Sequence, residues 1–289
     1  MRKKNIHSIV VVYKPDVFHL EKLICELLKQ TNYVYICNNS DEDIEFNVER
    51  VEVLNFKQNL GIAKAQSIGM EKAFSNNADF IIQFDQDSFP EKNMTDKLLV
   101  SFELLLNLGY KIGIIAPQDY SSITLDPSKS ASGDKIEIPH SESNCYFVDT
   151  VISSGCMISK ETYQIVGSMK DELFIDLVDH EYCWRTKYNK LKIVKNFDCK
   201  LYHQLGNGII NFTPLFSVCD CAPFRHYYSY RNAIYLYGFS YVPLKWKLKS
   251  ILKNIMLFSV ILLTMNQKKQ RIKYAIKGIF HGFKRKMDY

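Results

Sequence analysis

The sequence predicts an α/β protein with a mostly parallel central sheet flanked by helices. Three observations lead to this prediction. Short apolar runs of strand length alternate with helical patterns in the first half of the chain, several runs end in polar residues, and no Pro- or Gly-rich linker divides residues 1–240. Such alternation is typical of parallel sheets with helices on both faces. Ligands bind these sheets beyond the carboxyl ends of the strands.

The elements of the first half follow from their hydrophobic periodicity. Strand Ile6–Tyr13 leads into a helix over Val17–Leu28, where apolar residues recur every three or four positions. Further helices are expected at Gly61–Phe74 and Leu98–Leu108. The other strands are expected at Tyr33–Cys37, Val51–Leu54, Phe80–Phe84 and Ile112–Ala116, the last of them stopped by Pro117.

The second half is less regular. Residues 118–144 are polar with little period, so we expect an excursion or loop there. A strand over Tyr146–Ile152, a short helix over Lys160–Val166 and a helix from Asp179 to about Lys190 follow. With the aromatic segment 222–242, these elements complete a predicted domain over residues 1–242.

Residues 243–289 form a separate basic segment. They contain 12 Lys or Arg residues and one acid, whereas residues 1–242 contain 25 basic and 30 acidic residues. Basic positions alternate with apolar ones and Trp246, which is typical of an amphipathic helix lying on an anionic membrane surface. The alternative is a helix packed on the protein with a solvated basic face. Binding to nucleic acid is not expected, because the preceding residues offer no basic groove.

The expected location is the cytoplasm, on the inner face of the cell membrane. No apolar stretch reaches the ~18 residues of a membrane-spanning helix. The first residues lack the apolar core of a signal peptide. The eight cysteines include no C-x-x-C pair, and scattered thiols without a secretion signal indicate a reducing compartment.

The most informative motif is Phe80–Ser88, where a short apolar run leads into Asp85 and Asp87. Residues i and i+2 of a strand point to the same side, so both carboxylates should emerge together where the strand leaves the core. Their charges repel unless a cation lies near. Because Mg²⁺ is commonly held by one or two carboxylates and substrate phosphates, the motif favours a phosphorylated or nucleotide-linked substrate. The D-x-D pattern alone is common by chance.

Six blocks of the sequence resemble the family-2 inverting glycosyltransferases of GT-A fold, in the branch of the rhamnosyltransferases. The blocks keep their order over about residues 6–236, and the D-Q-D-S and F-I-D-x-V-D-x-E blocks are the specific ones. The blocks are V-V-Y-K-P-D at 11–16, N-L-G-I-A-K-A-Q at 59–66, F-D-Q-D-S at 84–88, S-S-G-C at 153–156, L-F-I-D-L-V-D-H-E-Y-C-W-R at 173–185 and H-Q-L-G at 203–206.

The resemblance implies a metal-dependent enzyme. Its expected reaction moves L-rhamnose from dTDP-rhamnose to a hydroxyl of a lipid-linked cell-surface polysaccharide precursor. Asp87 would coordinate Mg²⁺ or Mn²⁺ on the donor diphosphate, Asp85 would contact the ribose or the metal, and His203 would lie near the metal. Asp179 would be the general base that takes the proton of the acceptor hydroxyl; capping of its helix is the alternative role.

Further residues are implied around the two substrates. The usual base-contacting aspartate of the family is replaced here by Cys37, a poor hydrogen-bonding partner, so Asn38, Asn39 or Asp16 could substitute for it. Tyr13 could stack on the base, and Gly61 would let the backbone approach the ligand. The residues expected at the donor are Tyr13, Asn38, Asn59, Gly61, Asp85, Gln86, Asp87 and Arg231, and those expected at the acceptor are Gly155 and Glu181.

Other functions remain open from the sequence. The same fold could use a UDP-hexose donor. The chain could also be a non-catalytic, membrane-attached module that binds sugar nucleotides, although the intact Asp85, Asp87 and Asp179 argue against this. A nucleotidyltransferase fits the acids at the strand end but not the later Asp179 block.

Overall fold

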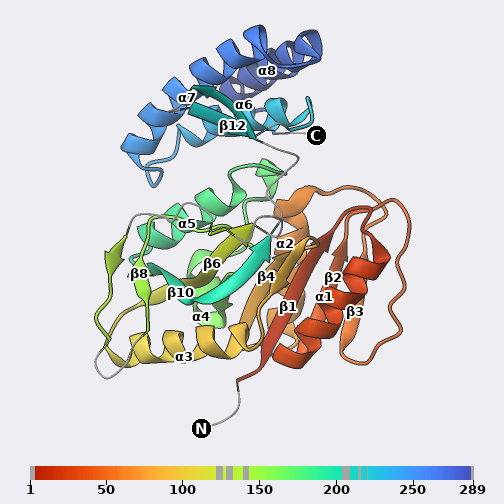
Figure 1. Cartoon of the computed structure of the whole chain (residues 1–289), viewed down its shortest axis with the longest axis vertical. Helices are drawn as coiled ribbons and strands as arrows, with labels where there is room; N and C mark the ends of the chain where they lie inside the picture. The colour runs from red at the N-terminus through yellow and green to blue at the C-terminus, as the bar shows by residue number, and fades with distance from the viewer. Residues whose placement is uncertain are drawn as a thin grey trace.

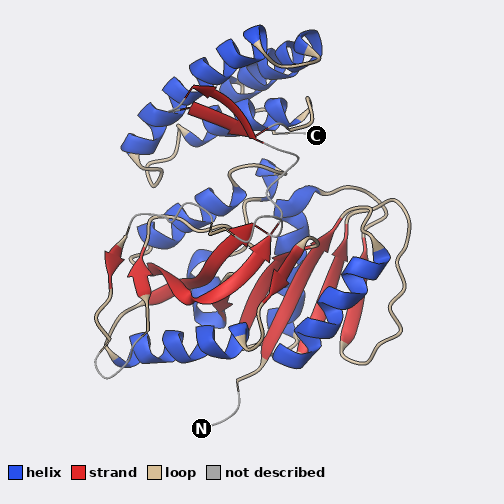
Figure 2. Ribbon diagram, in the orientation of Figure 1, coloured by secondary structure: helices blue, strands red, loops and turns tan. Residues whose placement is uncertain are grey.

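The computed structural model describes residues 4–121, 126–127, 133–138, 143–203, 209–213, 216–219 and 221–287. Within these residues, ten strands form one sheet in the order β3-β2-β1-β4-β9-β6-β10-β8-β7, with β5 paired to β10. Helices cover both faces, and a layer of three further helices lies above the edge where β1, β4 and β10 end (Figures 1 and 2). The α/β class is confirmed.

The first half of the sheet is parallel, as predicted. It consists of β1 (Ile6–Val12), β2 (Tyr33–Asn38), β3 (Val51–Asn55) and β4 (Phe80–Asp85). Alternate residues of β1 enter different cores: Ile9 packs on the side of helix α2 (Gly61–Ser75), and Val10 on the side of helix α1 (Val17–Gln30). Asp16 begins α1 by accepting a hydrogen bond from the backbone N–H of His19.

The second half of the sheet is mixed. Strands β6 (Ile112–Ser121) and β10 (Lys192–His203) are parallel. The short β9 (Met157–Ser159) lies between β4 and β6 and is antiparallel to both. Antiparallel pairings also join β10 to β5 (Ser88–Pro90) and to β8 (Cys145–Phe147), which in turn pairs with β7 (Asp134–Lys135). Because β9 is antiparallel to both β4 and β6, the six long strands β1, β2, β3, β4, β6 and β10 all run in the same direction, as predicted, and only short strands oppose them.

Three predicted details are wrong. Strand β6 does not stop at Pro117 but continues to Ser121. On one edge, β6 pairs with β9 only through Ile114 and Ile115, so no partner strand there needs a hydrogen bond from the N–H that proline lacks. The predicted strand over residues 146–152 ends at Phe147. Residues 118–144, expected to be an excursion, contribute the end of β6 and the whole of β7 among their described positions.

Helices α3 (Met94–Asn107), α4 (Lys160–Val166) and α5 (Val178–Tyr188) complete the body of the protein, with a 3₁₀ turn at Asp171–Leu173. Helix α3 packs with α1 on one face of the sheet, whereas α4 and α5 lie with α2 on the other. The short helix over Lys160–Val166 is confirmed, and α5 begins one residue before the predicted start.

The last third of the chain builds a helical layer. It contains the hairpin of β11 (Ile209–Thr213) and β12 (Phe216–Cys219), followed by α6 (Arg225–Leu236), α7 (Leu244–Leu263) and α8 (Lys268–Phe283). Helices α6 and α8 lie in close backbone contact, since a Cβ at Gly278 would come 2.4 Å from the carbonyl oxygen of Tyr227. None of the helices in the described ranges is long and apolar enough to cross a membrane.

Trp246 faces the protein instead of a membrane surface. Its ring packs against Trp184 of α5, with 4.5 Å between the ring centroids. This contact fits the alternative interpretation, in which the helix packs on the protein. The basic segment is thus packed on the body through one face of α7.

A buried polar joint connects α6 to the segment between the 3₁₀ turn and α5. The Arg231 guanidinium donates to the carbonyls of Glu172 and Leu173 at 2.8 and 3.1 Å. The Asn232 side-chain amide lies 2.8–2.9 Å from the carbonyls of Leu173, Ile175 and Asp176. These bonds hold a segment in which three non-glycine residues adopt positive φ, namely Phe174, Asp176 and Leu177. We call residues 172–177 the strained loop.

Replacing Asn232 should loosen this joint. Asn232→Leu keeps the branched shape of the side chain but removes the donor to the carbonyls of Ile175 and Asp176, which should cost about 2–4 kcal/mol of unfolding free energy. Denaturant unfolding measures this loss. The control is Asn107→Leu at the exposed end of α3, which should change stability little. Equal stability of the two variants would contradict the structural role of Asn232.

Candidate active site

The polar residues predicted at the strand ends converge at one edge of the sheet. Asp85 of β4 is in register with Val11 of β1, and Val12 is in register with Asn38 of β2. The chain after β1 is tied to the chain after β4, because the backbone N–H of Tyr13 donates to Gln86 Oε1 at 2.7 Å. The polar residues that follow these strands therefore lie at one edge of the sheet.

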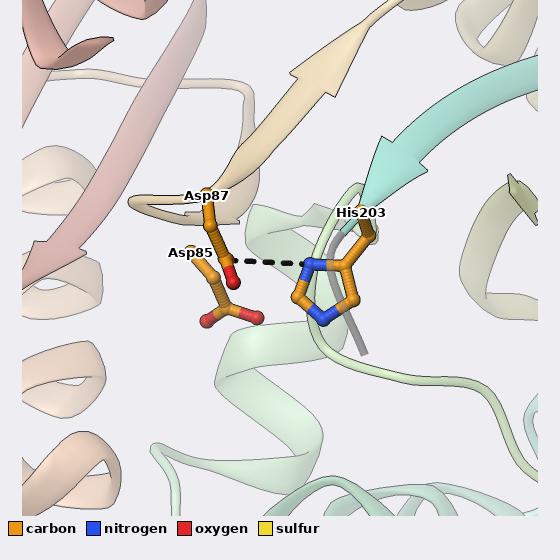
Figure 3. A group of neighbouring side chains, drawn as sticks. All are labelled: Asp85, Asp87 and His203. Carbon is orange, nitrogen blue, oxygen red and sulfur yellow. Dashed lines mark ion pairs between the residues drawn. The ribbon is translucent and has the colours of Figure 1, made fainter. Parts of the chain in front are cut away.

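Asp85, Asp87 and His203 form a group of potential metal ligands (Figure 3). Their ligand atoms all lie within 4.8 Å of one another. Asp87 Oδ1 is 3.4 Å from His203 Nδ1. The two aspartates follow β4, whereas His203 ends β10, so strands that are far apart in the sequence build the group.

Two serines hold His203 in place. The Ser88 hydroxyl is 2.8 Å from His203 Nδ1, in the pairing of β5 with β10. Ser154 donates from its hydroxyl to Ser88 Oγ at 2.7 Å and accepts from the backbone N–H of Asp85 at 3.2 Å. This chain of hydrogen bonds connects the histidine ring to the backbone of Asp85. The sequence blocks contained both serines, but their non-local pairing gave no local signal.

The group concentrates negative charge. Burial raises the pKa of Asp85 to about 6, and the carboxylates of Asp87 and Asp179 act in the same direction, while His203 opposes them. A divalent cation would reverse this effect, because it favours the ionised carboxylates.

The residues present fit such a cation. Carboxylate oxygen and imidazole nitrogen are ordinary ligands of divalent metals. Ligands about 2.0–2.1 Å from Mg²⁺ are at most about 4.2 Å apart, so the three side chains need only a small adjustment. Because Asp87 is exposed, the group is accessible to a substrate that could supply further oxygen ligands.

Asp179 lies in the first turn of α5, directly after the strained loop, and lines a small pocket together with Gln83 of β4 and Ser153. Its charge adds to the raised pKa of Asp85 and, behind burial, to that of Asp176. The N-cap of α5 is Leu177, and Asp179 Oδ1 accepts a hydrogen bond from the N–H of His180 at 2.8 Å. The helix dipole favours an acid there, but the capping role considered from the sequence is not observed.

Residues predicted at the donor fall into two groups. Tyr13 is 45% exposed, so its ring is accessible for stacking. Asn59 is also exposed, and its Oδ1 accepts from the N–H of Gly61 at 2.9 Å, in a turn that precedes α2. Asp16 is occupied as the N-cap of α1. Tyr13, Gln86 and Asn59 thus remain candidates for donor contacts.

The other donor-side predictions need correction. The Asn38 side chain is buried and bonded to the carbonyl of Glu42 and to Asn55, so it has a structural role. Gly61 is needed for its φ of +81° and for the close approach of Phe174, whose side chain would lie 2.5 Å from a Cβ there. Cys37 points into the core, where burial raises the pKa of its thiol to about 12.

Three more predicted contacts are also corrected. Arg231 is fully buried in the joint to the strained loop and does not reach a donor phosphate. Glu181 is fully buried too, where it accepts from Arg185 and from the Tyr241 hydroxyl, so it does not face an acceptor. Gly155 is buried and donates from its backbone N–H to the carbonyl of Gln83 at 2.7 Å, with a φ of +79° that favours glycine.

Sequence reasoning missed one ion pair beside the site. Arg225 of α6 binds Asp176 of the strained loop. Sequence periodicity cannot pair these two positions, because they lie 49 residues apart. The residues after His203 in its block, 204–206, lie outside the described residues.

No family model matches the sequence. The chain is 31% identical over 287 residues to the dTDP-rhamnosyl transferase RfbF of Shigella flexneri, covering 97% of this chain and 96% of that protein. Its fold is similar to that of GalNAc-T7 in a crystal structure with UDP, GalNAc and Mn²⁺, with a TM-score of 0.60, 12% identity, and coverage of 98% of this chain and 56% of the other.

The fold is also similar to residues 1–349 of TarS from S. aureus. The TM-score is 0.58 at 12% identity, over 98% of this chain and 82% of the TarS fragment. At such identities these structures establish the GT-A fold. The similarity to RfbF over nearly the whole of both chains also establishes the family. The chain belongs to the family of the dTDP-rhamnosyl transferase RfbF and is a glycosyltransferase of GT-A fold.

Proposed function

We propose that the enzyme transfers L-rhamnose from dTDP-rhamnose to a hydroxyl of a lipid-linked polysaccharide precursor. The observation that carries the proposal is that Asp85, Asp87 and His203 gather at one sheet edge in a chain related to a dTDP-rhamnosyl transferase over 97% of its length. The donor diphosphate would lie at the aspartate–histidine group, and the sugar between that group and Asp179.

Asp179 is the proposed general base. It would take the proton of the acceptor hydroxyl as the hydroxyl oxygen attacks the anomeric carbon and the bond to the donor diphosphate breaks. A Mg²⁺ or Mn²⁺ ion held by Asp85, Asp87 and His203 would neutralise the charge that develops on the departing dTDP. Tyr13 would stack on the base from the end of β1. Attack from the face opposite to the diphosphate inverts the anomeric configuration.

The donor and the metal can be tested together. With Mn²⁺ or Mg²⁺, the purified protein should release dTDP from dTDP-rhamnose and should not release UDP from UDP-glucose. Excess chelator should stop the reaction. Asp87→Asn should abolish it because the neutral amide no longer balances the charge of the metal, whereas Asp96→Asn, an exposed acid of α3, should not. Turnover of UDP-glucose alone would favour the UDP-hexose alternative, and full activity in chelator would exclude the metal.

The base is tested separately. Asp179→Asn should lower the transfer rate by about 10²–10⁴-fold while donor binding, measured by calorimetry, is retained. Glu172→Gln is the matched control, since Glu172 is an exposed acid of the strained loop. Transfer at the parental rate by Asp179→Asn would rule out this assignment, and Asp176 would be examined next.

We further propose that the enzyme attaches to the inner face of the cell membrane through α7. Leu248, Leu252 and Ile255 lie along one side of this helix and are 60–61% exposed. The segment from residue 243 onward carries 12 basic residues and one acid. Each basic side chain near an anionic surface contributes about 1 kcal/mol of attraction, so an anionic lipid surface matches both the apolar stripe and its charge.

Attachment should therefore depend on the apolar stripe. Replacing Leu248, Leu252 and Ile255 together with Gln should strongly reduce flotation with anionic liposomes, because exposed positions can lose apolar area without unfolding the protein. The matched control replaces Leu106, Leu108 and Ile165, which are exposed elsewhere, with Gln and should float as the parent does. High salt should weaken attachment of the parent as the Debye length falls to ~3 Å near 1 M. Equal flotation of the two triple variants would refute the proposal.

A further inference from the structure

A cavity of about 410 Å³ lies between the strained loop and the helical layer. Asp176, Leu177 and His180 line it from the body, and Arg225 of α6 and Lys249 and Lys253 of α7 line it from the layer. Its volume falls within the range of about 300–1,000 Å³ that is usual for small-ligand sites. Two of its lining residues, Leu177 and His180, lie within two positions of the candidate base Asp179 in the sequence.

The lining of the cavity is positively charged. Among its described residues there is one acid, Asp176, and Arg225 is already paired with it. Lys249 and Lys253 add two positive charges, and no ion pair of the described residues involves them. His180 lines the same cavity. An anion with several oxygen acceptors would satisfy these groups.

The position of the cavity on α7 adds a second constraint. Residues 246, 249, 250, 253, 254 and 257 line the cavity, whereas Leu248, Leu252 and Ile255 form the exposed apolar stripe of the same helix. One helix therefore presents ammonium groups to the cavity and hydrocarbon to the outside. A ligand that joins an anionic group to a hydrocarbon chain matches both sides.

We propose that this cavity binds the phosphate or diphosphate that connects the lipid to the sugar of the acceptor. The inference rests on the proposed transfer to a lipid-linked acceptor and deepens it. The anion would lie against Lys249, Lys253 and His180, the lipid would follow the apolar stripe of α7, and the acceptor sugar would extend toward Asp179. Lys249 and Lys253 thus become residues that select the acceptor.

Binding can be measured without donor or catalysis. Farnesyl diphosphate is a short prenyl diphosphate that serves as the probe, and chelator keeps it from the aspartate–histidine group by removing metal. Intrinsic tryptophan fluorescence is the readout, since Trp246 lines the cavity. We expect saturable binding by the full chain and affinity lower by about 10- to 100-fold for the double variant Lys249→Ala/Lys253→Ala, because two charge-assisted contacts are lost.

Matched variants and ligands define the outcome. Lys269→Ala/Lys273→Ala removes the same charge from exposed positions of α8 and should bind as the parent does, and Lys249→Arg/Lys253→Arg should retain most of the affinity. Farnesol and inorganic diphosphate should both bind more weakly than farnesyl diphosphate. Unchanged affinity in the double alanine variant, or equal affinity for farnesol, would overturn the proposal. Donor turnover by the same proteins is assayed in parallel, so that a failure of the proposed reaction is seen separately from a failure of this site.

Discussion

The structure depends on the buried joint in which Arg231 and Asn232 hold the strained loop. Positive φ in Phe174, Asp176 and Leu177 costs free energy in non-glycine residues and leaves carbonyls that no helix or strand satisfies. The two side chains of α6 supply the missing donors. Because the loop leads directly into Asp179, the position of the candidate base is set by a helix some 50 residues further along the chain.

Much of the fold follows from local pattern. Strands β1 to β4 and helices α1 and α2 were predictable because each carries its own periodicity. The short strands β5 and β9 were not, because three residues have no period and are defined by partners distant in the sequence. Pro117 was misjudged for the same reason: whether a strand tolerates proline depends on which edge is paired.

The site was predictable where side chains that can bind a metal stand at the end of a strand. Asp85 and Asp87 stand at a strand end and share one side, and His203 joins them through the pairing of β5 with β10. Asn38, Glu181 and Arg231 are expected at the substrates because of where they fall in the resemblance to the family. Burial decides otherwise, since a fully enclosed polar side chain must be satisfied by the protein, and burial cannot be read from residue type.

The contact between α6 and α8 has a consequence for how such proteins can be recombined. Gly278 lets the two helices pack so closely that the position of α8 depends on the surface of α6. Helix α6 in turn carries the hydrogen-bond donors for the strained loop. The natural unit of exchange between related enzymes is therefore not the segment after residue 242. A chimera that takes its last helices from a relative should also take α6 and residues 172–177 from that relative, so that α6 still fits both α8 and the strained loop.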